Sequence, residues 1–207
     1  VNNFIYNYRG RGVTLDTGAA LDVVGNYVEL GPSTTRPHHG FMIIPAQSSV
    51  PLKNAFYVEG NVHSQYRPDA GAGEEWAVFA QDVQSSENIA DEALHRRETP
   101  HGYLSVATHD AVTAREMILA SAGASVVRDA VDTRLVAEAS SGGTMGQIIT
   151  DPSEVGGWPD IPMGTPYPDA DGDGMDDDWE VARGLDPSDP SDGALDDDDD
   201  GYPNLEE

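Results

Sequence analysis

Three runs near the start of the chain carry one pattern: Val1-Asn-Asn3-Phe4-Ile5, Val24-Gly-Asn26-Tyr27-Val28 and Glu59-Gly-Asn61-Val62-His63. In each run an asparagine is followed by two residues that are mostly apolar or aromatic. Asn3, Asn26 and Asn61 lie 23 and 35 residues apart. A period in the twenties, lengthened by loop insertions, is typical of the coils of a parallel β-helix.

The repeat predicts a mainly β fold over residues 1–107, formed by terminal β-helix coils and wrapping loops. Asparagines at the same point of successive coils can hydrogen-bond to one another and form a ladder. The alternative is an ordinary β-sandwich with asparagines in its turns. Stacked repeats bury their faces against neighbouring repeats and need at least about three copies for stability, and the chain starts inside a predicted strand at Val1. We therefore expect it to be a C-terminal part of a longer protein.

Residues 108–165 are predicted to form a helical wrap and a linker rich in proline and glycine. One helix is expected between an N-cap at Thr108 or Asp110 and a stop at Gly123. A second helix is expected after Asp129, with Leu135 among its inward residues.

Two segments that contain tryptophan carry structural predictions. Residues 76–79 are expected to form a short strand, and Trp158 is expected to anchor the linker against the β-helix. Clusters of proline and glycine predict a domain boundary near residue 165. Residues 166–207 then form a separate C-terminal module.

Charge is distributed unevenly along this chain of 207 residues. The formal net charge is −26, and residues 169–207 hold 17 acidic side chains and one arginine. Such a field repels nucleic acid and anionic membranes, so neither is expected as a partner. The sequence has no cysteine and no apolar run long enough to span a bilayer. We expect an extracellular, secreted protein whose signal peptide lies in a missing N-terminal part.

Two twelve-residue calcium-loop patterns stand in tandem in the tail, starting at Asp169 and at Asp196. Each has oxygen-bearing side chains at loop positions 1, 3, 5, 9 and 12 and glycine at position 6, the spacing that a hard cation with oxygen ligands requires. The predicted calcium ligands are Asp169, Asp171, Asp173, Met175, Asp177, Glu180, Asp196, Asp198, Asp200, Tyr202, Asn204 and Glu207.

The loop pattern also assigns a role to each ligand. Met175 and Tyr202 would offer backbone carbonyls, and Asp177 and Asn204 would act through water. Glu180 would be bidentate, as would its counterpart at the end of the second loop. A short helix from Asp177 to Arg183, closed by Gly184, is expected to leave the first loop. The alternative is an acidic, disordered solvating segment.

Several stretches carry a family resemblance. They are Val1-Asn-Asn-Phe-Ile-Tyr-Asn7, Leu21-Asp-Val-Val-Gly-Asn-Tyr27, Gly31-Pro32, Ala122-Gly-Ala124, Arg128-Asp-Ala-Val-Asp-Thr-Arg134, Ile148-Ile149 and Glu154-Val-Gly-Gly-Trp158-Pro159. In this order they resemble the last coils and the C-terminal wrap of bacterial pectate lyases with a right-handed parallel β-helix. The tail, Asp171-Gly-Asp-Gly-Met-Asp-Asp-Asp-Trp-Glu180, is similar to the EF-hand-like or thrombospondin-type-3-like calcium module often appended there.

The resemblance implies calcium-dependent cleavage of a polyuronate by β-elimination, in which an arginine takes the C5 proton. In that family the arginine lies in an Arg-x-Pro-type segment on earlier coils, and Arg36-Pro37 and Arg67-Pro68 have different neighbours. We therefore place no catalytic residue in this chain and expect the chain alone to be an inactive monomer. Arg9 and Arg11 are candidate contacts to uronate carboxylates, or else solvated loop arginines.

Two other functional classes remain open from the residues. The tandem loops could be a dockerin-like or adhesin-like interaction module on a non-catalytic β-helix, although Pro187 and Pro190 disfavour the helix that usually follows a dockerin loop. A β-helix hydrolase would instead carry paired carboxylates on its earlier coils.

Overall fold

The structure is a computed structural model that describes residues 1–44, 53–69, 74–79, 92–102, 106–161 and 163–206. The chain divides into two compact units, Val1–Pro159 and Asp160–Glu207. Each unit is described by itself. The division of the first unit near residue 107 stays a prediction.

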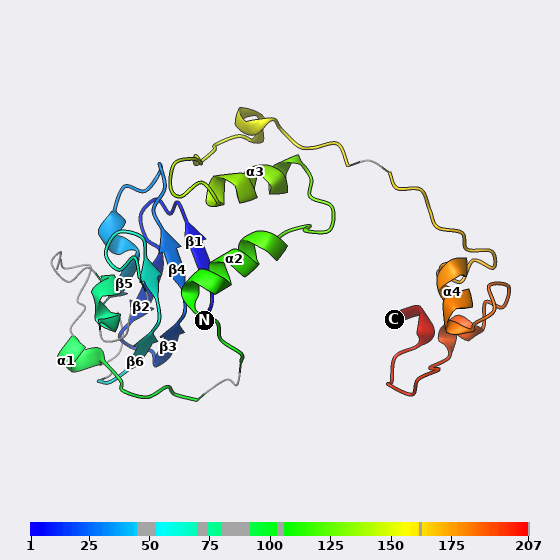
Figure 1. Ribbon diagram of the computed structural model, residues 1–207, viewed down its shortest axis with the longest axis horizontal. Helices are drawn as coiled ribbons and strands as arrows, with labels where there is room; N and C mark the ends of the chain where they lie inside the picture. Colours follow the sequence, from blue (N-terminus) through cyan, green and yellow to red (C-terminus); the bar gives the residue numbers. More distant parts are fainter. Residues whose placement is uncertain (45–52, 70–73, 80–91, 103–105, 162, 207) are drawn as a thin grey trace. The chain divides into compact units, whose positions relative to one another are not determined.

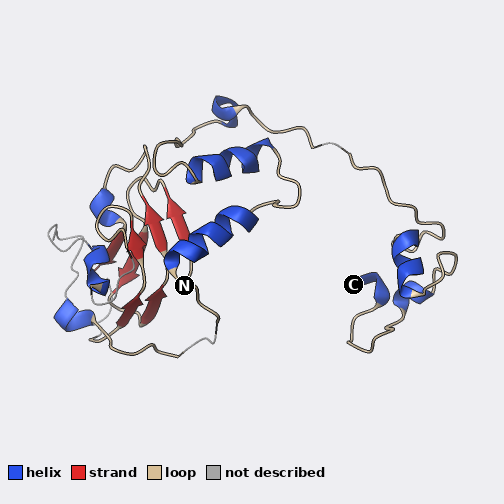
Figure 2. Ribbon diagram, in the orientation of Figure 1, coloured by secondary structure: helices blue, strands red, loops and turns tan. Residues whose placement is uncertain are grey.

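Among the described residues, seven short strands form the core of the first unit and pair in parallel (Figures 1 and 2). They are β1 (Phe4–Tyr6), β2 (Val13–Asp16), β3 (Leu21–Val24), β4 (Tyr27–Glu29), β5 (Phe41–Ile44), β6 (Phe56–Glu59) and β7 (Val62–His63). One sheet has the order β1-β4-β7, a second pairs β2 with β5, and a third pairs β3 with β6. The three strands of one stretch thus pair in order with the strands of the next, and the fold is mainly β with parallel sheets.

The register of the strands stacks the asparagines of the sequence repeat. Phe4 pairs with Tyr27, and Tyr27 pairs with Val62, so the residue before each strand is brought into line. The Asn3 side-chain amide donates to Asn26 Oδ1 over 2.9 Å, and that of Asn26 donates to Asn61 Oδ1 over 2.8 Å. The predicted asparagine ladder is therefore confirmed.

Apolar side chains from successive strands fill the space between the sheets. Fully buried members include Phe41, Ile43 and Phe56, and alternation along each strand turns such residues inward. Gly40 precedes β5 at a point of close approach, because a Cβ atom there would overlap the imidazole ring of His63. That ring is itself buried, and its Nε2 lies 3.0 Å from the Pro37 carbonyl.

Helix α2 (Ala111–Ser121) covers the sheet that contains β1 and β4 (Figure 1). Its Arg115 pairs with Glu29 at 3.0 Å and lies over the Phe4 ring at 5.0 Å. Asp110 caps the helix by accepting the Thr113 N–H. The N-cap at Asp110 and the end of this helix before Gly123 are confirmed.

Helix α3 (Ala130–Ala139) begins after its predicted N-cap, Asp129. The expectation that Leu135 faces inward is wrong, because Leu135 is 48% exposed. The more covered side of α3 carries the ion pair between Arg134 and Glu138, at 2.8 Å. A polar pair thus replaces the apolar stripe that the sequence pattern suggested.

Two expectations for tryptophan-containing segments are wrong. Residues 76–79 are not a strand but belong to the 3₁₀ helix η2 (Glu75–Phe79), in which Trp76 and Phe79 are buried side by side. Trp158 is 85% exposed and does not anchor the linker. Gly156 and Gly157 both have positive φ angles, and the turn that they form leaves the indole in solvent.

The remaining short helices of the described residues complete the element list. In the first unit they are η1 (Pro37–His39), α1 (Glu92–His95) and η4 (Pro152–Val155). The second unit contains α4 (Asp177–Arg183), η5 (Asp192–Ala194) and η6 (Asn204–Glu206). The predicted helix with its left-handed stop at Gly184 (φ 84°) is confirmed in α4. Within the part of the chain that the structure describes, no helix is long and apolar enough to cross a membrane.

Candidate metal centre

The first tail loop is shaped by hydrogen bonds from backbone N–H groups to its own aspartates. Asp169, at position 1, accepts from the N–H of Gly174 over 3.2 Å, and the positive φ of Gly174 allows the chain to turn there. Asp173, at position 5, accepts from Met175 over 2.9 Å. Asp177, at position 9, accepts from Ala170 over 2.8 Å. The loop is thus closed around its acidic side chains.

The second tail loop repeats this frame position by position. Asp196 accepts from Gly201 over 2.9 Å, and Asp200 accepts from Tyr202 over 2.9 Å. Asn204, at position 9, accepts from Asp197 over 3.2 Å. Two segments that share only a spacing of residue types therefore adopt the same hydrogen-bonding pattern.

The side chains at position 9 have hydrogen-bond partners within their own loops. The Asp177 and Asn204 side chains hold the N–H of position 2 in their own loops. Asn204 is also buried, and its amide donates to the Asp192 carbonyl over 2.8 Å. In this structure both side chains therefore brace their loops.

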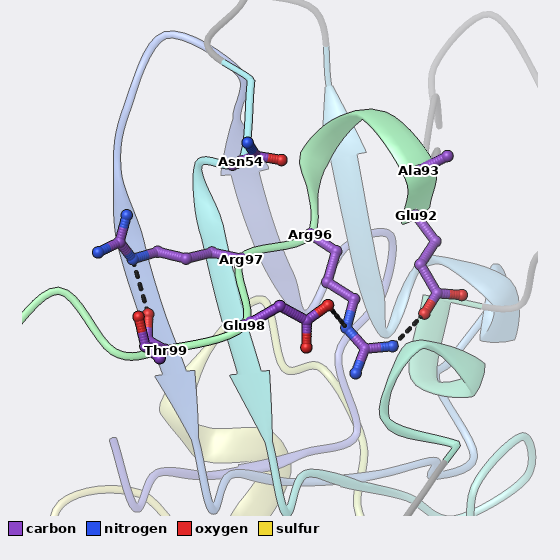
Figure 3. A pocket seen from close by; sticks show the side chains of 7 residues that line it. All are labelled: Asn54, Glu92, Ala93, Arg96, Arg97, Glu98 and Thr99. Atoms are coloured by element: carbon purple, nitrogen blue, oxygen red, sulfur yellow. Dashed lines mark hydrogen bonds and ion pairs between the residues drawn. The ribbon is translucent and has the colours of Figure 1, made fainter.

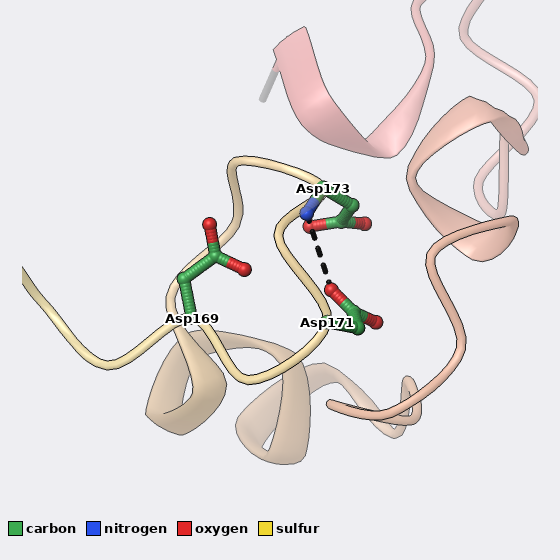
Figure 4. Close-up of side chains that lie close together, drawn as sticks. All are labelled: Asp169, Asp171 and Asp173. Atoms are coloured by element: carbon green, nitrogen blue, oxygen red, sulfur yellow. Dashed lines mark hydrogen bonds between the residues drawn. The ribbon is translucent and has the colours of Figure 1, made fainter.

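Among the described residues of the second unit, carboxylate oxygens gather at three places, and the ligand atoms of each set lie within 4.8 Å of one another. The sets are Asp169, Asp171 and Asp173; Asp173, Glu180 and Asp192; and Asp196, Asp198 and Asp200. Figure 4 shows the first set, with the Asp173 N–H donating to Asp171 over 3.2 Å. Asp173 belongs to two sets and so joins them. The set of the second loop is exposed.

The set around Glu180 is buried and has oxygen atoms without protein partners. Glu180 is fully buried, and neither of its carboxylate oxygens has a hydrogen-bond partner among the described residues. One oxygen each of Asp171, Asp173 and Asp192 is also buried and unpartnered there. Buried, unpaired carboxylates are unfavourable when they are charged, so this arrangement needs either bound protons or a cation.

The electrostatics of Glu180 agree with that need. In the absence of a cation, loss of hydration and repulsion from Asp171, Asp173 and Asp192 raise the pKa of Glu180 to about 7. Loss of hydration also raises the pKa of Asp171. A divalent ion with several oxygen ligands fits such a donor set, because hard cations prefer carboxylate and carbonyl oxygens.

Asp192 is the residue that sequence reasoning missed. It lies outside both twelve-residue patterns, four residues before the second one, so the loop spacing gives no signal for it. Among the predicted ligands, Met175 is buried next to the first set and Tyr202 is exposed. Glu207 lies outside the described residues.

The predicted substrate contacts, Arg9 and Arg11, lie in the first unit. Both are exposed, on the connection between β1 and β2.

A cavity of about 500 Å³ in the first unit is lined in part by Arg96 and Arg97 (Figure 3). Its Arg96 is held by Glu92 at 2.5 Å and by Glu98 at 3.3 Å, and the Arg97 Nε donates to the Thr99 carbonyl. Both guanidinium groups therefore already contact other groups of the protein. The cavity is a weaker site for an anion than the presence of two arginines suggests.

Comparison with known proteins relates the chain to pectate lyases. It is 33% identical over 99% of its length to a protein of Aspergillus flavus named "Probable pectate lyase C". Proteins of the same name from Neosartorya fischeri and Emericella nidulans are 33% and 30% identical over 90% of the chain.

These alignments cover 46%, 42% and 41% of the three relatives, so the chain spans less than half of their length. No family model matches the chain, and no solved structure matches it. Over nearly its whole length, the chain is related by sequence to fungal proteins named as probable pectate lyases.

Proposed function

We propose that this chain is a C-terminal part of a secreted polysaccharide lyase that cleaves pectate-like polyuronates. The similarity to proteins named pectate lyase, over 99% of the chain, carries this proposal. The parallel pairing of β1, β2 and β3 with β4, β5 and β6 supports terminal coils of a parallel β-helix. A monomeric extracellular protein without cysteine could draw on bound calcium for stability.

The proposed reaction is a β-elimination. A base removes the C5 proton of a uronate, the C4–O bond breaks, a C4–C5 double bond forms, and the departing sugar oxygen takes up a proton. Calcium bound to the uronate carboxylate would make the C5 proton more acidic. The catalytic residues are proposed to lie outside these 207 residues. Within the chain, Arg9 and Arg11 are proposed contacts to substrate carboxylates, since guanidinium groups pair well with them.

The second part of the proposal is a structural calcium module in the tail. The twelve predicted ligands would hold one ion in each loop, with Glu180 and Glu207 closing the two sites. The unpartnered oxygens of Glu180 support the first site, and the matching hydrogen-bond frame supports the second. Because fixed carboxylates repel one another, binding would be coupled to folding of the module.

Lyase activity is tested by expressing the complete reading frame that contains this chain. The protein is incubated with polygalacturonate and calcium, and the ultraviolet absorbance of the unsaturated product is followed. A rise that chelator abolishes is the expected result, with no rise for the 207-residue chain alone. No product from polygalacturonate or other uronates would overturn the lyase assignment and favour a binding protein.

Calcium binding is tested separately on the 207-residue chain by isothermal titration. Glu180→Gln should remove or severely weaken one site, because it takes away the negative charge that closes the first loop. Glu116→Gln, an exposed acidic position on α2, is the matched control and should leave the titration unchanged. An unchanged titration for Glu180→Gln would contradict the first calcium site.

A further inference from the structure

We propose that Asp192, which lies outside both calcium loops, is a ligand of the first loop's cation and couples that site to the second loop. This inference rests on the proposed calcium module and extends it. It assigns a metal-binding role to the segment between the loops, which the twelve-residue pattern treats as a connection.

The position of Asp192 supports a ligand role. Its side chain is 7% exposed, and its oxygen lies within 4.8 Å of oxygens of Asp173 and Glu180. One carboxylate oxygen, Oδ2, accepts the Asp186 N–H over 2.9 Å. The other, Oδ1, is buried without a partner among the described residues.

The two carboxylate oxygens of Asp192 have different surroundings, as expected for a metal ligand. A hydrogen bond to one oxygen orients the carboxylate, and the second oxygen stays available for the ion. An acidic side chain placed only for solubility would instead point into water. Here three negatively charged groups face one another in a buried space, an arrangement that a divalent cation would neutralise.

The backbone around Asp192 connects this position to both loops. A Cβ atom on Gly193 would come within 2.6 Å of Asp173 Oδ2, so η5 packs directly against the first loop. The Asp192 carbonyl accepts the Asn204 amide over 2.8 Å, and Asn204 Oδ1 accepts the Asp197 N–H of the second loop. An ion that fixes Asp192 would therefore also fix Asn204 and, through it, the second loop.

The test is calcium titration of the 207-residue chain carrying Asp192→Asn. Asparagine can still accept the Asp186 N–H, and it leaves the Asp192 carbonyl in place, so the fold is expected to persist. We expect the first-loop dissociation constant to rise at least about tenfold, because calcium affinity follows the charge and rigidity of the ligand set. Asp189→Asn removes the same charge from an exposed position of the same segment and is expected to change it less than about twofold.

Terbium luminescence assigns the effect to a loop. Trp179 lies within the first loop, whereas the second contains Tyr202 and no tryptophan, so tryptophan-selective excitation reports on the first site. Trp158→Phe serves as the background for these measurements, since it removes an exposed indole outside the module. Asp192→Asn should weaken the tryptophan-sensitised signal, and Asp192→Glu should recover part of it.

Coupling is tested in the same proteins. Asn204→Ala should weaken terbium binding at the first loop although Asn204 belongs to the second, because the Asp192 carbonyl then loses the amide that holds it in place. If Asp192→Asn behaves like Asp189→Asn while Glu180→Gln loses a site, Asp192 is not a ligand and the calcium module stands. If the unmodified chain binds no calcium, the proposed module itself fails. Loss of α4 hydrogen-exchange protection in Asp192→Asn at saturating calcium would also count against a ligand role, since the defect would then be in folding.

Discussion

The asparagine ladder of the parallel sheets and the carboxylate cluster of the tail are both polar and largely buried, yet they are completed in different ways. Asn61 accepts two hydrogen bonds from Asn26 and donates to the carbonyls of Val23 and Glu59. Glu180 is equally buried, and neither of its oxygens has a described protein partner. The polar atoms of Asn61 are hydrogen-bonded within the protein, whereas the carboxylate of Glu180 is complementary to a cation.

This difference separates two ways of stabilising structure. In the sheets of the first unit, buried polar groups add specificity because a shift of register would break the ladder. In the tail, burial of carboxylates is unfavourable until a ligand compensates it. The stability of the first unit should therefore respond to mutation and pH, and that of the tail should respond mainly to calcium.

Chelation is expected to produce the largest contrast. With excess chelator, α4 and η5 should lose hydrogen-exchange protection, because repulsion among the buried carboxylates then acts without compensation. Protection in β4 and β5 should stay unchanged. Mass spectrometry of exchanged peptides measures both regions in one sample. Equal protection of α4 with and without calcium would remove the basis of the comparison.

Substitution of the ladder is expected to have the next largest effect. Asn61→Ala leaves several buried groups unpaired and should lower the free energy of unfolding of the first unit by about 2–4 kcal/mol. Asn3→Ala, at the exposed end of the ladder, should cost about 1 kcal/mol. Urea unfolding followed by Trp76 fluorescence would compare the two variants. Equal losses in the free energy of unfolding would mean that the burial of Asn61 adds nothing to the stability that the ladder provides.

The two tail loops can be compared at one matched position. Asp173 and Asp200 both stand at loop position 5, but Asp173 also belongs to the buried set with Glu180 and Asp192. Asp173→Asn should weaken calcium binding about tenfold more than Asp200→Asn, which affects an exposed set. Isothermal titration of both variants provides the measurement, and a larger loss for Asp200→Asn would reverse the ranking of the loops.

A smaller effect is expected from His63. Burial lowers its pKa, and its Nδ1 accepts the N–H groups of Gln65 and Tyr66 while Nε2 faces the Pro37 carbonyl. The folded protein thus holds the neutral ring, and the unfolded chain takes up a proton below a pH of about 6.5. The stability of the first unit should therefore fall as pH drops below that value, by at most about 1.4 kcal/mol per pH unit.

His63→Gln tests this origin of the pH dependence. It should flatten the decline in stability measured by urea unfolding at several pH values. His109→Gln, at an exposed histidine, should leave the decline unchanged. An identical pH profile in all three proteins would assign the effect to other groups.

Local patterns allowed much of this structure to be predicted. The asparagine spacing identified the ladder because the parallel strands that follow the asparagines pair in register. Asp110, Asp129 and Gly184 marked helix ends through their own chemistry. Leu135 and Trp158 were misassigned because their burial depends on what the neighbouring segments cover. No local rule supplies that information.

The candidate metal centre shows the same limit. Loop spacing pointed to Asp169, Asp171 and Asp173, which the structure gathers, although their binding of calcium stays a prediction. Asp192 could not be found in this way, because it reaches the site from a separate segment. The loop pattern also did not show that the Asn204 side chain forms hydrogen bonds within the module.

The contact between Gly40 and His63 has a consequence for mutational tolerance. Gly40 has an ordinary helical backbone (φ −57°, ψ −48°), so conformational preference does not require glycine there. The requirement is spatial, because any side chain would displace the imidazole from Pro37. Gly60 is the reverse case, with a φ of +61° and open space around its Cα. A saturation library should therefore accept asparagine at position 60, where left-handed backbone is tolerated, and reject even alanine at position 40.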